Sequence, residues 1–436
     1  MKFLRQLLTL STFQIVNLGL TLLSRIVLAR VLVEAAFGAF GAALNATVVL
    51  SRILSFGLAP ANQFYASKKQ FDRGTVIATG AILALASSII ATGIAYALVP
   101  VVNSTLLGNH PNSQAMLNSF LPCLPVVILA MNLGVMLIPL GEVKAFGILQ
   151  VLTGSAFILP FFIFRAFMPG ADAAVWAQCS VWVFSLSYLV WKLSPFLSGL
   201  KWDKSLAKEM LVYGWKSWPN VILNIGLARV ATLLGALYLS PRDLSIFVLA
   251  VNIVEGLTAP HSSLGQLVMT KSASDPEQFG RNLLKALRLS CLMLAGLTAA
   301  LVLGGYFLIP ILFGHGFKES YYVTLIVVLT AIAHIQLRTM SSYFAGLERP
   351  QLTTRALAIE MVLMLGLLPT LGSQFGLYGV AVASALSAVG SWAAAGWFLR
   401  RLIRAPIRDQ LWPKKGDYIW MRSLLSSARQ DKQSVA

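Results

Sequence analysis

The chain has 436 residues, of which 57% are hydrophobic and 11% are charged, and its mean hydropathy is +0.76. A soluble protein carries roughly 25% charged residues, so this composition excludes an ordinary soluble domain and indicates an integral membrane protein. The net charge of +18 would suggest nucleic acid as the partner of a soluble chain. In a membrane protein we attribute this charge to cytoplasmic loops that meet anionic lipid headgroups, and we expect no nucleic-acid partner.

The hydrophobic runs have the length of a helix that crosses ~30 Å of hydrocarbon, and the short alternating segments of a membrane β-barrel are absent. We predict an all-α fold with twelve transmembrane helices, at residues 9–31, 37–58, 75–101, 117–140, 144–166, 172–194, 214–238, 244–268, 283–313, 320–345, 354–373 and 376–400. No small-residue cleavage site follows the first run, so we interpret it as an uncleaved span.

The distribution of basic residues predicts the orientation of these helices. With a cytoplasmic N-terminus, 26 of the 34 Lys and Arg residues fall on the cytoplasmic side, including a basic C-terminal tail. The positive-inside rule therefore puts both termini in the cytoplasm, and we expect a multi-pass protein of the bacterial inner membrane.

The chain also contains signs of an internal duplication. The segment 70–73 (QFDR) recurs as 278–281 (QFGR), and Asn45 and Asn252 hold matching places in the second and eighth helices. An even number of helices in each half implies parallel repeats. We predict an N-terminal lobe at 1–194, a cytoplasmic linker at 195–213, a C-terminal lobe at 214–400 and a basic cytoplasmic tail at 401–436.

Polar residues form stripes on several predicted spans. Gln14, Asn17 and Arg25 fall within about a 100° arc of the first helix, and Asn45 and Arg52 share an arc of the second. Similar stripes contain Asn252 with Glu255, and His334 with Arg338. Lipid would exclude such stripes, so they face other helices or water. Hydrogen bonds between helices, worth ~0.6 kcal/mol each, are the alternative explanation for the amides.

Arginines are the strongest of these signals, because a guanidinium in mid-membrane costs at least ~3 kcal/mol and usually faces a wet cavity or a partner. Four lie within apolar stretches: Arg25, Arg52, Arg229 and Arg338. They outnumber the embedded acids, Glu255 and Glu360, which points to an anionic substrate. Snorkelling of each arginine to the headgroups is the alternative.

Titratable groups within the spans are candidates for ion coupling, with H⁺ or Na⁺ as the coupling ion. We select Glu255 and His334, and with less support Glu360, which we expect to pair with Arg355 or Arg349. A satisfied hydrogen-bonding role is the alternative for each of them.

Catalytic and metal-binding motifs are absent from the sequence. The three cysteines lie in apolar segments at unrelated spacings, and no GxxxxGK[ST] segment is present. The predicted external connections are short. We therefore predict no enzyme activity, no metal site and no cofactor apart from a coupling ion.

Several segments resemble a known family. The segment 23–32 (LSRIVLARVL), followed by 37–40 (FGAF), resembles the opening of Wzx-type polysaccharide or O-antigen flippases, and 345–352 (AGLERPQL) and 376–384 (GLYGVAVAS) are similar to their late region. That family belongs, with the MATE drug antiporters and the lipid II flippases, to the MOP superfamily. The resemblance implies two six-helix lobes, MATE-like, around a central cavity that opens to each side in turn.

The resemblance also implies a function. The substrate would be an undecaprenyl-diphosphate-linked oligosaccharide, moved from the cytoplasmic to the periplasmic leaflet for O-antigen (lipopolysaccharide), capsule or exopolysaccharide synthesis. A polysaccharide polymerase and a chain-length regulator are the implied protein partners. Lipid II flippases use arginines of the first two helices for diphosphate, which corresponds to Arg25 and Arg52. Twelve helices instead of fourteen argue against a peptidoglycan precursor.

Two other functions stay open. An ion-coupled, MATE-like exporter of small organic cations should carry acids in its cavity, where this chain offers arginine. A membrane glycosyltransferase or polymerase should have a sizeable external loop with catalytic polar residues, which the sequence does not contain.

Overall fold

The computed structural model describes residues 2–32, 34–68, 70–105, 111–168, 170–196, 201–235, 237–258, 262–313 and 315–403, and every element in these ranges is a helix. Residues Leu8–Val221 form one compact unit, here called the N-unit. The other compact unit consists of the described residues of Ile222–Ala436 together with those of Met1–Leu7. We call it the C-unit. The tail predicted at 401–436 lies outside the described residues from position 404 onward.

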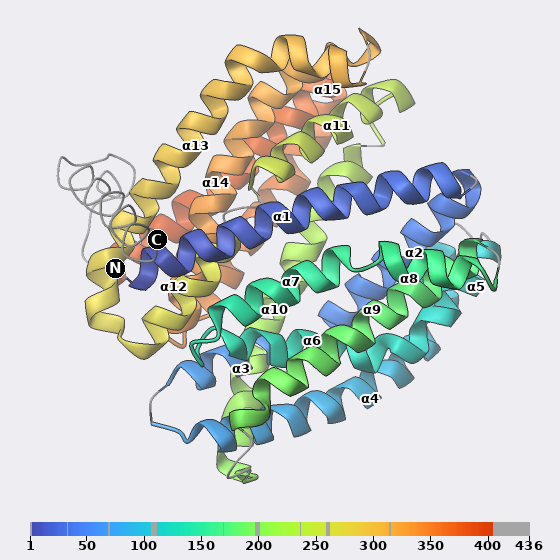
Figure 1. The fold of residues 1–436 in the computed structure, drawn as a ribbon. Coiled ribbons are helices and arrows are strands. Elements are labelled where there is room, and N and C mark those ends of the chain that lie inside the picture. The colour runs from blue at the N-terminus through green and yellow to red at the C-terminus, as the bar shows by residue number, and fades with distance from the viewer. Residues whose placement is uncertain are drawn as a thin grey trace, which may run out of the picture. The chain divides into compact units, whose positions relative to one another are not determined.

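The N-unit is built of helices (Figure 1), and its core contains several aromatic side chains among the aliphatic ones. Phe120 lies at its centre, with ring centroids 6.0 Å from Phe40 and 5.6 Å from Trp182. The helices are α1 (Lys2–Val31), α2 (Glu34–Ile53), α3 (Leu58–Ser67), α4 (Arg73–Thr105), α5 (Pro111–Phe120), α6 (Leu124–Gly134), α7 (Val143–Ser155), α8 (Ile158–Arg165), α9 (Gly170–Leu193) and the first part of α10 (Lys204–Gly235). Helix α10 begins inside the segment predicted as a linker and continues into the C-unit.

The C-unit is organised around one helix, α14 (Ser320–Gly346). Helix α14 packs against all the other long helices of the unit, and a core that includes Phe247, Val327 and Leu368 fills the contacts. The other helices are α11 (Pro241–Thr258), α12 (Ser262–Ser274), α13 (Pro276–Phe313) and α15 (Gln351–Ile403).

The second helix ends earlier than predicted. It was expected to run to residue 58, but α2 stops at Ile53, and the short helix α3 follows. Phe56 and Gly57 have φ of 49° and 71°, which ends the helix, and a Cβ at position 57 would collide with the carbonyl of Gly214 on α10. The Trp218 indole donates to the freed Ile53 carbonyl at 2.7 Å. A carbonyl freed inside a membrane must find such a partner, which is why the break is tolerated.

The eighth predicted helix, 244–268, also falls into two helices, α11 and α12. Each unit therefore contains a helix of about 20 residues, a short helix and a long one: α2–α3–α4 has 20, 10 and 33 residues, and α11–α12–α13 has 18, 13 and 38. The repeated segments 70–73 and 278–281 lie at the start of α4 and α13. The order of elements thus follows the duplication that the sequence indicates.

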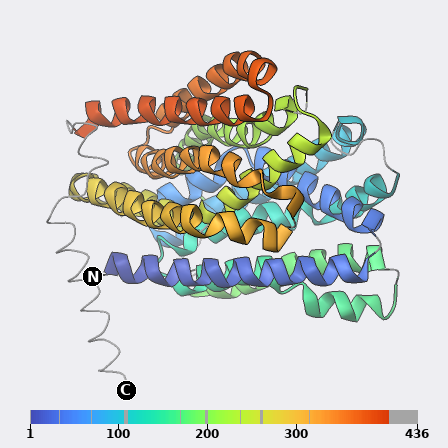
Figure 2. The same ribbon diagram turned by 90° about the horizontal axis from the view of Figure 1, so that it is seen from above.

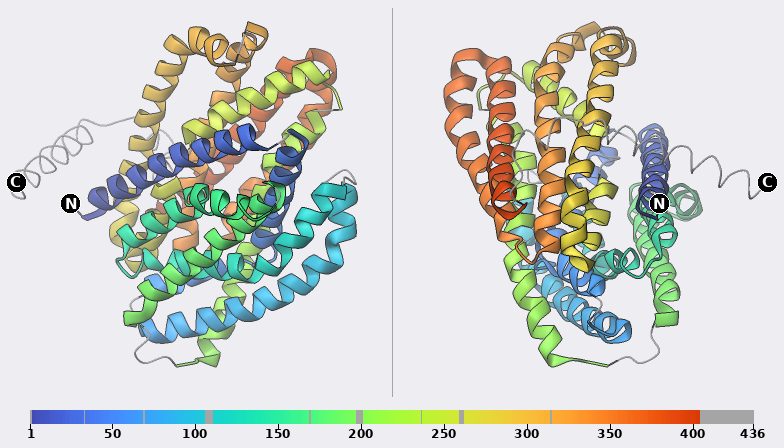
Figure 3. Two further views of the ribbon diagram at one scale, coloured as in Figure 1. Left: turned by 45° about the vertical axis from the view of Figure 1, so that its right-hand side comes forward. Right: turned by 90° about the vertical axis from the view of Figure 1, so that its left-hand side faces the viewer.

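Helix α15 is a hairpin of two arms rather than one rod. Gly376 has φ 54° and ψ −128°, a conformation that is essentially restricted to glycine, and it separates the arms. A Cβ on Gly379 would collide with the Leu371 carbonyl, and a Cβ on Gly390 with the Leu363 side chain, as expected for antiparallel arms. Figures 2 and 3 show both arms in red and orange-red. They correspond to the eleventh and twelfth predicted spans.

Eight helices among the described residues are long and apolar enough to cross a membrane, or nine if the bent pair within α13 is counted as one span. The hairpin α15 counts once in that number although it has two arms. Helix α10, which holds most of the seventh predicted span, and helices α11 and α12, which cover the eighth, are not in this set. The chain is a multi-pass helical membrane protein.

Candidate functional site

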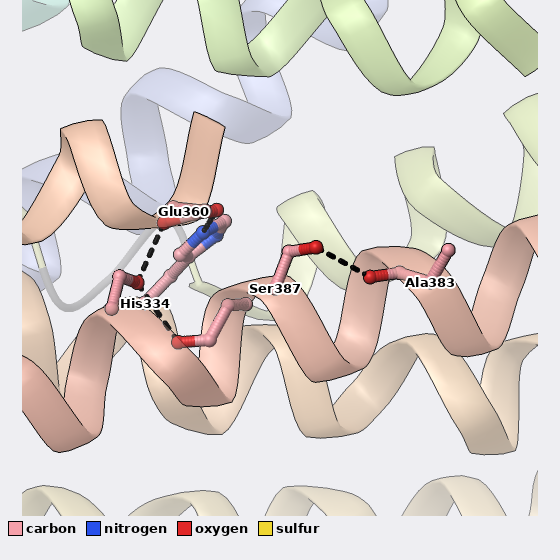
Figure 4. A network of polar contacts seen from close by, with 6 residues as sticks. His334, Glu360, Ala383 and Ser387 are labelled. Carbon is pink, nitrogen blue, oxygen red and sulfur yellow. Dashed lines mark hydrogen bonds and ion pairs between the residues drawn. The ribbon is translucent and has the colours of Figure 1, made fainter. Parts of the chain in front are cut away.

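A buried polar cluster joins three segments of the C-unit (Figure 4). His334 of α14 approaches Glu360 of the first α15 arm, with Nε2 at 2.7 Å from Oε1. Ser391, on the second arm, donates its hydroxyl to the other carboxylate oxygen, Oε2, at 2.6 Å. Both oxygens of Glu360 are thus occupied by hydrogen-bonding groups. We call these three residues the His–Glu–Ser cluster.

The two ends of this cluster differ in accessibility. The side chain of Glu360 is 2% exposed, whereas that of His334 is 33% exposed. A carboxylate removed from water is destabilised by several kcal/mol unless it is paired and hydrogen-bonded. The imidazole and the hydroxyl supply that compensation, and the imidazole is the more exposed end of the cluster.

The second α15 arm can approach the cluster because its packed face is made of small residues. Ala383, Ser387, Ser391 and Ala395 are each at most 1% exposed. Ser387 donates to the carbonyl of Ala383 at 2.7 Å, so its hydroxyl is satisfied within the helix (Figure 4). Small side chains let membrane helices approach closely. Nothing in the spacing of these residues along the sequence marks Ser391 as a partner of a carboxylate.

The expected pairing of Glu360 with Arg355 or Arg349 is wrong. Both arginines are exposed, and the carboxylate contacts His334 and Ser391 instead. The reason is the direction of the helix face: Glu360 points inward between α14 and the second arm, and Arg355, five residues earlier, lies on a different face.

The polar stripe of the first helix divides into two parts. Asn17 and Thr21 face α7, where the Thr21 hydroxyl donates to the Gly154 carbonyl at 3.1 Å. Thr21 therefore has the interhelical hydrogen bond that was the alternative to cavity lining, and Asn17 packs against Gly154 of the same helix. Gln14 is half-buried, and Arg25 is exposed.

The candidate polar residues of the second helix lie on an exposed face of that helix. Gly38, Asn45 and Arg52, spaced by seven residues, are all exposed, whereas Ala43, Thr47 and Leu50 are packed in the unit. Asn45 donates to the Gly41 carbonyl of its own helix at 2.9 Å. Seven residues are close to two helical turns, so the exposed residues form one line along α2.

The remaining candidate residues lie in the C-unit half of the chain. Asn252 and Arg338 are exposed, and Arg338 is one helical turn beyond His334. The side chains of Arg229 and Glu255 lie outside the described residues. Of the three ion-coupling candidates, the structure therefore brings two together, His334 and Glu360.

A second buried polar centre lies in the N-unit. Asn62 of α3 and Asn132 of α6 are both 0% exposed. The side-chain amide of Asn62 donates to the backbone carbonyl of Asn132 at 3.0 Å. The sequence analysis does not identify it, because residue 62 was placed in a loop. The Asn62 amide holds the short helix α3 against α6, and Gly80 of α4 leaves room for the Asn62 side chain.

Comparison with known proteins gives a family and a fold. A family model described as "Polysaccharide biosynthesis protein" matches residues 27–322. No curated protein matches the chain. A multidrug resistance MATE family transporter of the MOP superfamily, solved in an outward-facing conformation, has a TM-score of 0.78 at 14% identity, with 92% of this chain and 95% of that chain covered. A MOP superfamily transporter from Pyrococcus furiosus, whose binding pocket is described as reversed in polarity, has a TM-score of 0.77 at 14% identity, with 92% and 96% covered.

These matches confirm the predicted all-α, MATE-like fold class and the resemblance to a family of polysaccharide biosynthesis proteins. The family is one of polysaccharide biosynthesis proteins, and the fold is that of MATE transporters.

Proposed function

Because the chain belongs to the family of polysaccharide biosynthesis proteins, we propose that it is a flippase for an undecaprenyl-diphosphate-linked oligosaccharide. It would move this lipid from the cytoplasmic to the periplasmic leaflet of the bacterial inner membrane by alternating access, with both termini in the cytoplasm. The product would serve the synthesis of O-antigen, capsule or exopolysaccharide, with a polymerase and a chain-length regulator as partners.

The observation that carries the proposal is the exposed line on α2. Asn45 and Arg52 lie along one face of an apolar helix whose other face is packed, and Arg25 is exposed on α1. An arginine on a membrane helix is stable only where it meets water or an anion. A guanidinium binds phosphate oxygens through two parallel hydrogen bonds, and this attraction is stronger in a site of low dielectric constant. A diphosphate fits this chemistry.

The polarity of these residues also separates the proposal from drug export. A binding site for organic cations should present carboxylates, but the exposed embedded residues named here are cationic or amide side chains. We propose Arg25, Arg52, Asn45 and Asn252 as substrate contacts, with Gln14, Arg229 and Arg338 as further candidates. Asn17 is the weakest candidate, because it faces α7.

Substitution of the two arginines tests this function. We expect Arg25→Ala and Arg52→Ala each to lower the rate of lipid-linked oligosaccharide translocation in proteoliposomes roughly 10- to 100-fold, because a charge-assisted hydrogen bond contributes ~1.5–3 kcal/mol. Lysine at either position should restore part of the rate. Arg30→Ala, at the exposed end of the same α1, is the matched control and should translocate normally. Full translocation by the Arg25→Ala/Arg52→Ala double variant would refute the substrate site.

A further inference from the structure

We propose that the His–Glu–Ser cluster is the proton-binding site that couples transport to a proton gradient. The inference rests on the proposed function and adds to it the coupling ion and the residues that bind it. Its evidence is the geometry of His334, Glu360 and Ser391, which join α14 and both arms of α15 through one buried carboxylate.

The short contact in the cluster requires a proton. A nitrogen and an oxygen at 2.7 Å share a hydrogen, so the pair of His334 and Glu360 always holds at least one proton between Nε2 and Oε1. With only this proton the pair has a net charge of −1. A second proton on Nδ1 makes the imidazole cationic and the pair neutral, and it leaves the Nε2–Oε1 hydrogen bond intact. The cluster can therefore bind and release one proton without breaking its buried contacts.

The surroundings explain why this proton matters. Glu360 is 2% exposed, so the net negative charge of the singly protonated pair lies in a medium of low dielectric constant and is strongly disfavoured. The imidazole is 33% exposed and can take up the compensating proton. Binding and release of the proton thus switch the buried pair of His334 and Glu360 between a neutral and a negatively charged state. A transport cycle can use this difference in charge to favour one conformation of the protein.

Other charged groups occur on every helix packed against α14. They are Arg338 on α14 itself, Arg355, Arg400 and Arg401 on α15, Lys271 on α12, Glu277, Arg281, Lys285 and Arg288 on α13, and Arg242, Asp243 and Glu255 on α11. Arg338 and Arg355 are exposed, and Glu360 has both oxygens occupied by His334 and Ser391.

The donors of the cluster favour H⁺ over Na⁺. A hard cation such as Na⁺ needs several oxygen ligands with available lone pairs, but here both carboxylate oxygens already accept hydrogen bonds and the third group is an imidazole. In the described part of the chain, no group of three or more His, Cys, Asp and Glu side chains is arranged to hold a metal ion.

The test uses the purified full chain in proteoliposomes that contain lipid-linked oligosaccharide. If one proton moves per cycle, a pH difference of one unit should drive about a tenfold steady-state imbalance of the oligosaccharide between leaflets. Glu360→Gln and His334→Asn should reduce that ratio to about one. Glu209→Gln, an exposed acid on α10, is the matched control and should keep the ratio. A ratio that survives in Glu360→Gln, or one driven by Na⁺ and not by pH, would overturn the proposal while leaving the flippase function intact.

A second measurement decides the proton site even if no translocation occurs. The chain has only four histidines, so NMR of protein labelled at histidine can assign the His334 signal by its loss in His334→Asn. We expect that signal to respond to pH in the wild-type protein and to respond differently in Glu360→Gln, which removes the buried charge beside the imidazole. Ser391→Ala, which removes one hydrogen bond and little volume, serves if Glu360→Gln does not fold. An unchanged His334 titration in these variants would refute the site independently of transport.

Discussion

Asn17 and Thr21 can reach the backbone of α7 because residue 154 has no side chain. A Cβ at this position would collide with the Asn17 amide oxygen, and the Thr21 hydroxyl donates to the Gly154 carbonyl. At the scale of single residues, the polar groups of the membrane helices thus serve two purposes. Some join neighbouring helices, as Thr21 does, and others, such as Arg52, stay exposed on an apolar helix.

We expect Gly154→Ala to destabilise the protein by ~1–3 kcal/mol, because the added methyl group must displace Asn17 from a packed contact. The melting temperature of the purified protein, followed by tryptophan fluorescence, measures the effect. Gly19→Ala on α1, which has no atom within 4 Å of the new Cβ, is the control and should leave the melting temperature unchanged or slightly raised. Equal melting temperatures for the two variants would contradict the close contact of α1 with α7.

At the scale of secondary-structure elements, the breaks between helices determine which side chains meet. Gly376 reverses the chain within α15, and this reversal brings Ser391 back to Glu360, 31 residues away in the sequence. The break between α2 and α3 likewise turns the polar residue Asn62 into the interior of the N-unit. Both breaks depend on glycines with positive φ, at positions 376 and 57.

Gly376→Ala should therefore destabilise the hairpin by ~1–3 kcal/mol through backbone strain alone, since no neighbouring atom lies near the added Cβ. Gly366→Ala, in the helical first arm and equally open, is the matched control and should be neutral or stabilising. Thermal unfolding of the two variants distinguishes them. The hairpin turn would be in doubt if Gly376→Ala melted at or above the temperature of Gly366→Ala.

At the scale of the whole molecule, the bias of Lys and Arg toward alternate connections predicts a definite orientation in the membrane. Cysteine labelling with a membrane-impermeant maleimide, in a variant whose three native cysteines are serine, tests it. Lys208→Cys, at the start of α10, should react only after the cells are opened, and Arg242→Cys, at the start of α11, should react in intact cells. The reverse pattern would show that both termini lie outside the cytoplasm.

The sequence by itself determined the fold class, the approximate places of the helices and the family resemblance. The physical reason is that a bilayer forces every long apolar run to satisfy its backbone as a helix, so length and composition suffice to locate it. The same holds for the unusual arginines, because a charge in an apolar run is visible without coordinates.

Only the tertiary structure decided which polar residues meet. The pairing of Glu360 with His334 and Ser391, rather than with the nearby Arg355, depends on how three helical segments pack, and residues 26 and 31 positions apart carry no local signal of contact. The early end of α2 at Ile53 could not be predicted from the sequence either. Trp218, whose indole donates to the Ile53 carbonyl, lies 165 residues away. Helical periodicity states which residues share a face, but the neighbour of that face is set by packing across the whole unit.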